Sequence, residues 1–144
     1  MKKAVTLAAV AAIAATAITG AAAAPPAEHV TSHTKRFVSH DIDSHQLGPN
    51  TFAGAAIDRR FGHVVAYEAF TGHSHPRLDS ATIWDSFAFR DGTISVVVRA
   101  GGGSVFGGDI LNGTGKYKGV HGTLNVRPSP HDPDKTFITL VYYL

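Results

Sequence analysis

The chain has 144 residues, with 13 Lys+Arg, 11 Asp+Glu, nine histidines and no cysteine. Lys2 and Lys3 lie in a segment that we expect to be removed, which leaves 11 basic against 11 acidic residues and no basic block. This balance excludes nucleic acid as an expected partner. Without disulfides, the core and the sheet hydrogen bonds alone must hold the fold.

Residues 1–24 have the pattern of a secretory signal peptide. Lys2 and Lys3 precede an apolar, alanine-rich run over 4–18, and small residues follow over 20–24. We expect cleavage near residues 22–27 and a secreted, extracellular protein that is not stably inserted in a membrane. A membrane anchor is the alternative, but the apolar run is shorter than the ~20 residues that a spanning helix needs.

The rest of the chain is long enough for one domain with one core. Residues 25–35 are polar with two prolines and are expected to be a flexible lead-in, so the domain covers 36–144. Strand patterns dominate from there, and no helical period appears. The expected strands cover 37–42, 51–57, 62–70, 81–90, 93–100, 104–111, 119–127 and 137–143, with loops over 43–50 and 71–78.

The glycine-rich stretch 109–124 indicates a sheet that curves. Asn112-Gly113 is a strong turn signal, and Gly122 within the next strand indicates a kink or a close backbone approach. Eight short strands with short connections predict an all-β fold, either a small antiparallel barrel or a sandwich. Segments 64–67 and 94–98 are apolar on both faces, so the outside is expected to be covered by subunit contacts or a second layer.

Two motifs resemble those of a known family. G-T-G-K-Y-x-G-x-x-G at 113–122 is similar to a segment of dirigent proteins and allene oxide cyclase barrels, and so is F-V-S-H-D-I at 37–42 followed by G-P-N-T at 48–51. The resemblance implies an eight-stranded antiparallel barrel of calycin type whose cavity takes a small apolar or phenolic ligand. It also implies that no cofactor is needed and that the protein is a homo-oligomer, namely a trimer.

His40 and Asp41 are neighbours on the first strand, so their side chains point to opposite faces. The resemblance places Asp41 inside as a catalytic pocket acid, and an apolar barrel would raise the pKa of its carboxyl group into a useful range. His40, in the same motif, is a candidate substrate-binding residue. The alternative is that Asp41 caps a turn or pairs with a surface arginine.

His121 lies where the plant family usually has arginine. The resemblance gives it a catalytic, anchoring role, but histidine lacks a fixed positive charge and titrates near neutral pH. This departure puts the transfer of the plant reaction in doubt. The alternative is a strand histidine that faces solvent or a subunit contact.

Tyr67, Trp84 and Arg99 are the other candidate substrate-binding residues. Tyr67 and Trp84 offer flat apolar faces with polar tips and could form a ligand wall, although such aromatics are more often core filler. Arg99 could counter Asp41 or Asp109 at the mouth of the barrel. A plain surface ion pair is the alternative and would contribute little.

His73 and His75 suggest a metal site that His63 could join, but no third ligand lies at a family spacing, so neither a metal nor a cofactor is expected. The sequence therefore predicts a secreted dirigent-like barrel that binds a small apolar molecule and steers its coupling or cyclisation. It would act as a cofactor-free cyclase or isomerase, or as an auxiliary protein that directs stereochemistry. The alternatives are a non-catalytic ligand-binding or protein-interaction barrel and, third, metal scavenging.

Overall fold

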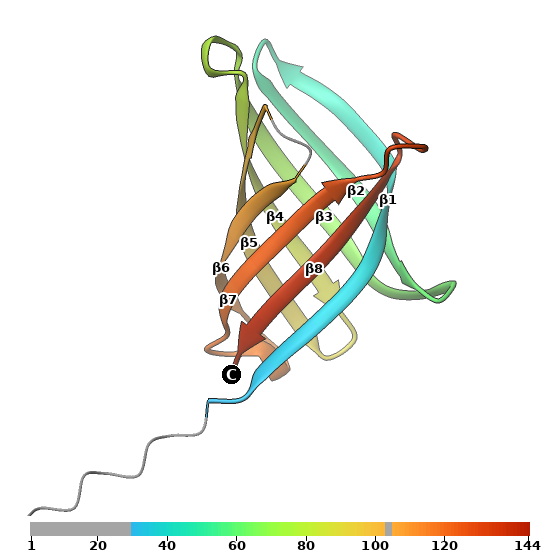
Figure 1. The fold of residues 1–144 in the computed structure, drawn as a ribbon, viewed down its shortest axis with the longest axis vertical. Helices are drawn as coiled ribbons and strands as arrows, with labels where there is room; N and C mark the ends of the chain where they lie inside the picture. Colours follow the sequence, from blue (N-terminus) through green and yellow to red (C-terminus); the bar gives the residue numbers. More distant parts are fainter. Residues whose placement is uncertain (1–29, 103–104) are drawn as a thin grey trace, which may run out of the picture.

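The fold is a closed barrel of eight antiparallel strands, as a computed structural model that describes residues 30–102 and 105–144 shows (Figure 1). Each strand pairs with its neighbour in the sequence, and β8 returns to β1. The all-β, eight-stranded barrel prediction is confirmed, and the sandwich alternative is excluded. The elements are β1 (Ser32–Gly48), β2 (Thr51–Arg60), β3 (His63–His75), η1 (Pro76–Leu78), β4 (Ser80–Phe89), β5 (Gly92–Gly101), β6 (Phe106–Gly113), η2 (Gly115–Tyr117), β7 (His121–Pro128) and β8 (Lys135–Tyr143).

Within the described ranges, no helix has the length and apolar character needed to cross a membrane. The signal-peptide prediction falls on residues 1–24, which lie outside these ranges.

Two strands are longer than their sequence patterns predict. β1 and β3 continue to Gly48 and His75, through segments that we expected to be loops. β1 also begins at Ser32, inside the expected lead-in. The extra residues are mostly polar and exposed, so hydrophobic alternation does not reveal them, yet their backbones stay paired with the neighbouring strands. The β1–β2 and β3–β4 hairpins therefore extend beyond the rest of the barrel (Figure 1).

The glycine-rich stretch closes one end of the barrel through a short 3₁₀ turn. Asn112 and Gly113 do not form the predicted hairpin turn, because they remain in β6 opposite Ser95 and Ile94. The chain reverses through η2 instead, where the Lys116 backbone N–H donates to the Asp91 carbonyl at 2.9 Å. The close approach expected at Gly122 is confirmed, since it has a φ of +148° and a Cβ there would overlap the carbonyl of Val141 in β8.

The end that contains η2, which we call the η2 end, is packed with aromatic and aliphatic side chains. Phe37 meets Phe87 edge-on with ring centroids 5.6 Å apart, and Tyr117 meets Tyr142 in the same way at 5.9 Å. The Lys35 ammonium lies 4.7 Å from the centroid of the Phe89 ring, a cation–π distance. The buried core includes Phe37, Phe87, Ile94, Val96, Tyr117, Leu124, Ile138, Leu140 and Tyr142.

Candidate functional site

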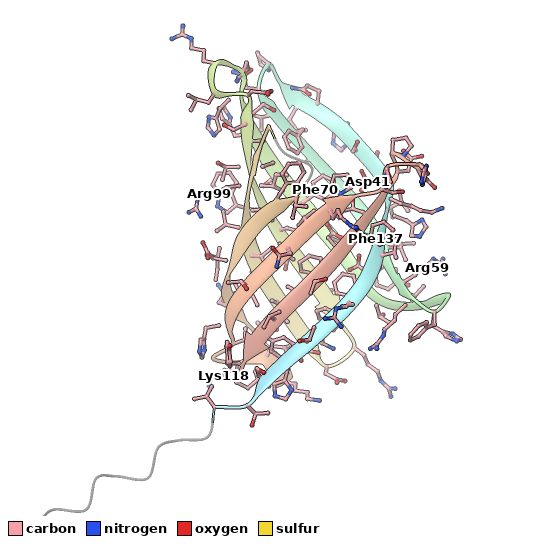
Figure 2. All side chains as sticks on the ribbon, in the orientation of Figure 1. Asp41, Arg59, Phe70, Arg99, Lys118 and Phe137 are labelled. Carbon is pink, nitrogen blue, oxygen red and sulfur yellow. The ribbon has the colours of Figure 1, made fainter. Side chains whose placement is uncertain are left out.

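The opposite end of the barrel, where β1–β2, β3–β4, β5–β6 and β7–β8 connect, holds a cavity of about 240 Å³; we call this the open end. Every strand contributes at least one lining residue. In Figure 2 the labelled Asp41 and Phe70 both lie at this end. The wall is mainly apolar, with a few polar side chains. The apolar part includes Phe52, Phe70, Ile83, Val98, Phe106 and Val126, and the polar part includes Ser39, Asp41, Glu68 and Asp85.

A cluster of three carboxyl groups lies at this cavity, two of them in its wall, and strand register brings them together. Asp58 pairs with Ala66 while Ala56 pairs with Glu68, so Asp58 and Glu68 are diagonal neighbours on the inner face. Glu68 pairs with Phe87 and Phe70 pairs with Asp85, which makes Glu68 and Asp85 diagonal neighbours in turn. We call Asp58, Glu68 and Asp85 the carboxyl cluster.

Ser39 completes the carboxyl cluster from β1. It pairs with Asp58 across the β1–β2 ladder and is buried. Its hydroxyl donates a hydrogen bond of 2.7 Å to Oε2 of Glu68. The cluster thus has one neutral donor from the neighbouring strand, which fixes the position of the Glu68 carboxyl group.

Burial and mutual repulsion change the titration of the carboxyl cluster. Asp58 is 0% exposed and Asp85 is 8% exposed. Burial, the charge of Glu68 and a hydrogen bond to it raise the pKa of Asp58 to about 8, against a smaller opposing effect of Ser39. Burial, followed by the same charge and hydrogen bond of Glu68, raises the pKa of Asp85 to about 10. Both aspartates therefore hold their protons at neutral pH.

Hydrogen bonding gives the same result for the two aspartates. If both aspartates were ionised, three of their oxygen atoms would lack a hydrogen-bond donor among the described residues: Oδ1 and Oδ2 of Asp58 and Oδ1 of Asp85. A proton on each aspartate lets it donate to Glu68 instead. A carboxylic acid that stays neutral at pH 7 can donate a hydrogen bond or a proton to a guest.

Two reciprocal phenylalanine–glycine pairs shape the cavity wall. Phe52 of β2 lies opposite Gly72 of β3, and Gly54 of β2 lies opposite Phe70 of β3. A Cβ on either glycine would overlap the ring of the facing phenylalanine, so the absent side chains leave room for the rings to lie across the inner wall. The two rings are 6.5 Å apart and tilted by 64°.

Asp41 is the predicted site residue that the structure places at the cavity. It lies at the mouth, on the same face of β1 as Ser39, and stays in contact with solvent. Partial burial, then the charges of Glu68 and Asp134, raise the pKa of its carboxyl group. Its backbone N–H donates to the Asp134 carbonyl at 3.1 Å, which ties the mouth to the β7–β8 connection.

His121 lies on the outside of the barrel, away from Asp41. It is exposed at the start of β7, and its ring stacks on the outward-facing Tyr143 with centroids 5.4 Å apart. His40 faces outward too, because its neighbours Ser39 and Asp41 both face the cavity. The structure therefore corrects the expectation that Asp41 and His121 share one pocket.

The expected ligand wall is also corrected. Tyr67 is 59% exposed and Trp84 is 47% exposed, because the inward positions of β3 and β4 are those of Glu68, Phe70, Ile83 and Asp85. Arg99 forms a 3.1 Å ion pair with Asp109 on the outer surface, which is the alternative that the sequence had left open. The labelled Arg99 points away from the barrel in Figure 2.

The histidines of the β3–η1 region form polar contacts rather than a metal site. The rings of His73 and His75 are 5.0 Å apart, and each approaches a threonine hydroxyl. Across residues 30–102 and 105–144, no group of three histidine, cysteine or carboxylate side chains is arranged to hold a metal ion.

Sequence reasoning did not single out the carboxyl cluster, although a signal for it was present. Ile83, Phe87 and Phe89 alternate along one face of the strand expected over 81–90, and the same alternation places Asp85 among them. Glu68 alternates with Ala66 and Phe70 in the same way. A carboxyl group at the centre of an apolar alternation is a signature of a functional interior.

Comparison of the sequence with family models and with curated proteins finds no match. The structure, in contrast, is similar to several solved barrels. It superimposes on a pyocyanin demethylase with a TM-score of 0.64 at 18% identity, covering 76% of this chain and 99% of that chain. The pterocarpan synthase dirigent protein PsPTS1 gives a TM-score of 0.68 at 16% identity, covering 78% of this chain and 95% of that chain.

A third similar structure is the Diels–Alderase AbmU from Streptomyces koyangensis, with a TM-score of 0.62 at 17% identity. The match covers 77% of this chain and 63% of that chain. At these identities the likeness concerns the fold. The chain has the fold of the dirigent- and cyclase-like barrels, as its two motifs predicted.

Proposed function

We propose that the barrel binds a small, mainly apolar molecule at its open end and steers the cyclisation or coupling of that molecule. The observation that carries this proposal is the carboxyl cluster: two protonated aspartates beside Glu68 in a mainly apolar cavity of about 240 Å³. Such a volume suits a guest with one or two rings and restricts its conformers.

Asp85 and Glu68 supply proton transfer in this proposal. Asp85 lines the cavity as a neutral acid and gives its proton to a carbonyl or epoxide oxygen of the guest, while the attached carbon forms the new bond that closes the ring. Glu68 accepts the proton that the attacking group releases and returns a proton to Asp85 along their hydrogen bond. The carboxyl cluster ends as it began, so the net change is an isomerisation that consumes no oxidant or reductant.

Asp41 and the phenylalanine rings have separate roles in this proposal. Asp41 at the mouth relays protons between the carboxyl cluster and solvent, since its raised pKa brings it closer to neutral pH. Phe52 and Phe70 hold the flat part of the guest against the wall. Positioning and acid–base catalysis together need no bound cofactor.

The solved barrels with this fold support the proposal. They include proteins described as a pterocarpan synthase dirigent protein and as a Diels–Alderase, whose names denote bond formation in small organic molecules. The proposal extends to the location of the protein. The lysine-led apolar segment over residues 1–24 supports action outside the cell, after removal of that segment.

The chemical test is stereoselective coupling. A panel of small phenols, comprising hydroxycinnamyl alcohols and hydroxyphenyl alkylamines, is oxidised by a separate one-electron oxidant with the mature protein present. We expect an enantiomeric excess with at least one phenol. Val98→Phe, which fills the cavity from β5, should return the product to a racemate.

Asp109→Asn provides the matched control, because Asp109 pairs with Arg99 on the outer surface. It should keep the full enantiomeric excess. Racemic product from the unaltered protein across the panel would contradict the coupling function. An excess that survives in Val98→Phe would show that the selectivity does not arise in this cavity.

A further inference from the structure

The open-end cavity carries charge of only one sign. Asp41, Glu68 and Asp85 line it, and no lysine, arginine or histidine is among the described residues of its wall. Asp58 adds a fourth carboxyl group next to Glu68. Because Asp58 and Asp85 hold their protons at neutral pH, the negative charge comes from Glu68 and Asp41. Inside a barrel with apolar walls, such groups act through a low dielectric, so the cavity repels anions and attracts cations.

Asp85 has an acceptor atom available to a guest, in addition to the hydrogen bond that it donates to Glu68. Its side chain is more than nine-tenths buried and faces the cavity, and its Oδ1 lacks a hydrogen-bond partner among the described residues. Buried oxygen atoms without a partner are rare in proteins, and an ordered water, a ligand or an ion commonly satisfies them. A guest with a cationic or hydrogen-bond-donating group would supply the missing partner.

Aromatic rings surround the same space. Phe52, Phe70 and Phe106 line the cavity together with the carboxyl groups. Aromatic faces attract cations, and quaternary ammonium ligands are recognised by groups of such rings. The barrel already uses this interaction at the η2 end, where the Lys35 ammonium lies over Phe89 and Tyr117.

From these observations we infer that the cavity selects an organic cation, namely a guest with an apolar body and a positively charged nitrogen. The nitrogen lies between Asp85, Glu68 and the phenylalanine rings, and the apolar body contacts Ile83 and Val98. The inference rests on the proposed function, since it names the guest of the same cavity. It also excludes carboxylate-bearing guests such as fatty acids.

Three probes of similar size test the inference: phenyltrimethylammonium, its neutral isostere tert-butylbenzene, and benzoate. Their dissociation constants are measured by NMR titration of the full mature chain at neutral pH. We expect the cation to bind about tenfold more tightly than the neutral isostere. Benzoate should not bind.

Isosteric variants assign the preference to the carboxyl groups. Glu68→Gln should weaken binding of phenyltrimethylammonium by about tenfold and leave tert-butylbenzene within a factor of about two. Asp85→Asn should have a smaller effect on the cation, because it replaces a group that is neutral at this pH. Asp41 lies at the solvent-accessible mouth, where a substitution should not disturb folding. Asp41→Asn should weaken binding of phenyltrimethylammonium by about threefold. Asp109→Asn on the outer surface should change neither probe.

The outcomes separate this inference from the proposed function. If tert-butylbenzene binds as tightly as the cation and the carboxyl variants have no effect, the cation inference is overturned while guest binding in the cavity stands. If none of the probes binds, binding of a small guest at the open end fails, and the inference fails with it.

Discussion

The two ends of the barrel differ in how their aromatic rings are packed and in the charged groups that lie beside them. At the η2 end, Phe37 packs against Phe87 and Phe89 packs against Tyr117. The ammonium group of Lys35 lies over the rings of Phe89 and Tyr117. At the open end, phenylalanine rings line a cavity together with carboxyl groups that have no cationic partner in the wall. One end therefore has a cation from its own chain over its rings, whereas the other end has carboxyl groups without a cationic partner, for which we propose a guest.

This contrast shows how a barrel of this size divides stability and function. The η2 end buries large apolar side chains completely, which contributes most of the hydrophobic stabilisation. The open end retains a void and buried carboxyl groups, both of which reduce the free energy of unfolding. A destabilised functional end requires a well-packed end to support it.

The two ends are expected to differ most in how much unfolding free energy is lost when a phenylalanine is truncated to alanine. Phe87→Ala leaves a cavity in the packed core and should lower the free energy of unfolding by about 3–5 kcal/mol. Phe70→Ala, at the half-buried wall of an existing cavity, should cost about 1–2 kcal/mol. Urea denaturation measures both. Equal losses would mean that the open end contributes as much stability as the η2 end.

The second prediction concerns pH. In the unfolded chain Asp58 and Asp85 titrate near 3.8, whereas in the folded barrel they hold their protons to about pH 8 and 10. Between these values the folded state binds more protons, so the free energy of unfolding falls as pH rises. The loss should be on the order of 1–3 kcal/mol per pH unit between about pH 5 and pH 8, where both aspartates are protonated only in the folded state.

Asp58→Asn sharpens this second prediction because it removes one of the raised groups while keeping its shape. It should flatten the decline of unfolding free energy between mildly acidic and alkaline pH. Asp109→Asn on the outer surface is the control and should retain the slope of the unaltered protein. A stability that rises with pH over this range would show that the aspartates are ionised in the folded state.

The third prediction tests the phenylalanine–glycine pairs. Gly72→Ala places a Cβ against the Phe52 ring and should cost about 1–3 kcal/mol of unfolding free energy. It should also weaken guest binding, because Phe52 lines the cavity. Gly107→Ala, in β6 with open space around its Cα, is the control and should be nearly neutral. Matching effects of the two substitutions would remove the steric explanation.

The smallest effect is expected on the outer surface. Arg99→Gln breaks an exposed ion pair with Asp109 and should change the free energy of unfolding by about 0.5 kcal/mol or less. Because Arg99 does not line the cavity, guest affinity should not change. A clear loss of affinity in Arg99→Gln would restore the role at the mouth that the sequence had suggested.

The fold could be predicted from the sequence because strand alternation and turn residues are local signals. These signals predicted the eight strands and the close backbone approach at Gly122. The prediction of a turn at Asn112-Gly113 was wrong, because pairing of β6 with β5 outweighs the local turn preference of these residues. Tertiary pairing is not visible in a short window of sequence.

The candidate site was only partly predictable. Asp41 lies at the cavity, on the face of its strand that the resemblance implied to be internal, and its catalytic role stays a prediction. Tyr67 and Trp84 were misplaced because aromatic character was weighed without the phase of each strand. The carboxyl cluster joins residues from three strands, and only the register of the closed barrel makes them neighbours. The predicted trimer stays a prediction.

The most direct measurement of the contrast between the two ends is methyl NMR of the ¹³C-labelled mature protein during titration with phenyltrimethylammonium. The account predicts shifts for the methyl groups of Ile83, Val98 and Val126, which line the cavity. Those of Ile94 and Leu140, in the packed η2-end core, should stay in place. Shifts confined to the core or to the outer surface, or no shifts at saturating probe, would contradict a guest-binding open end.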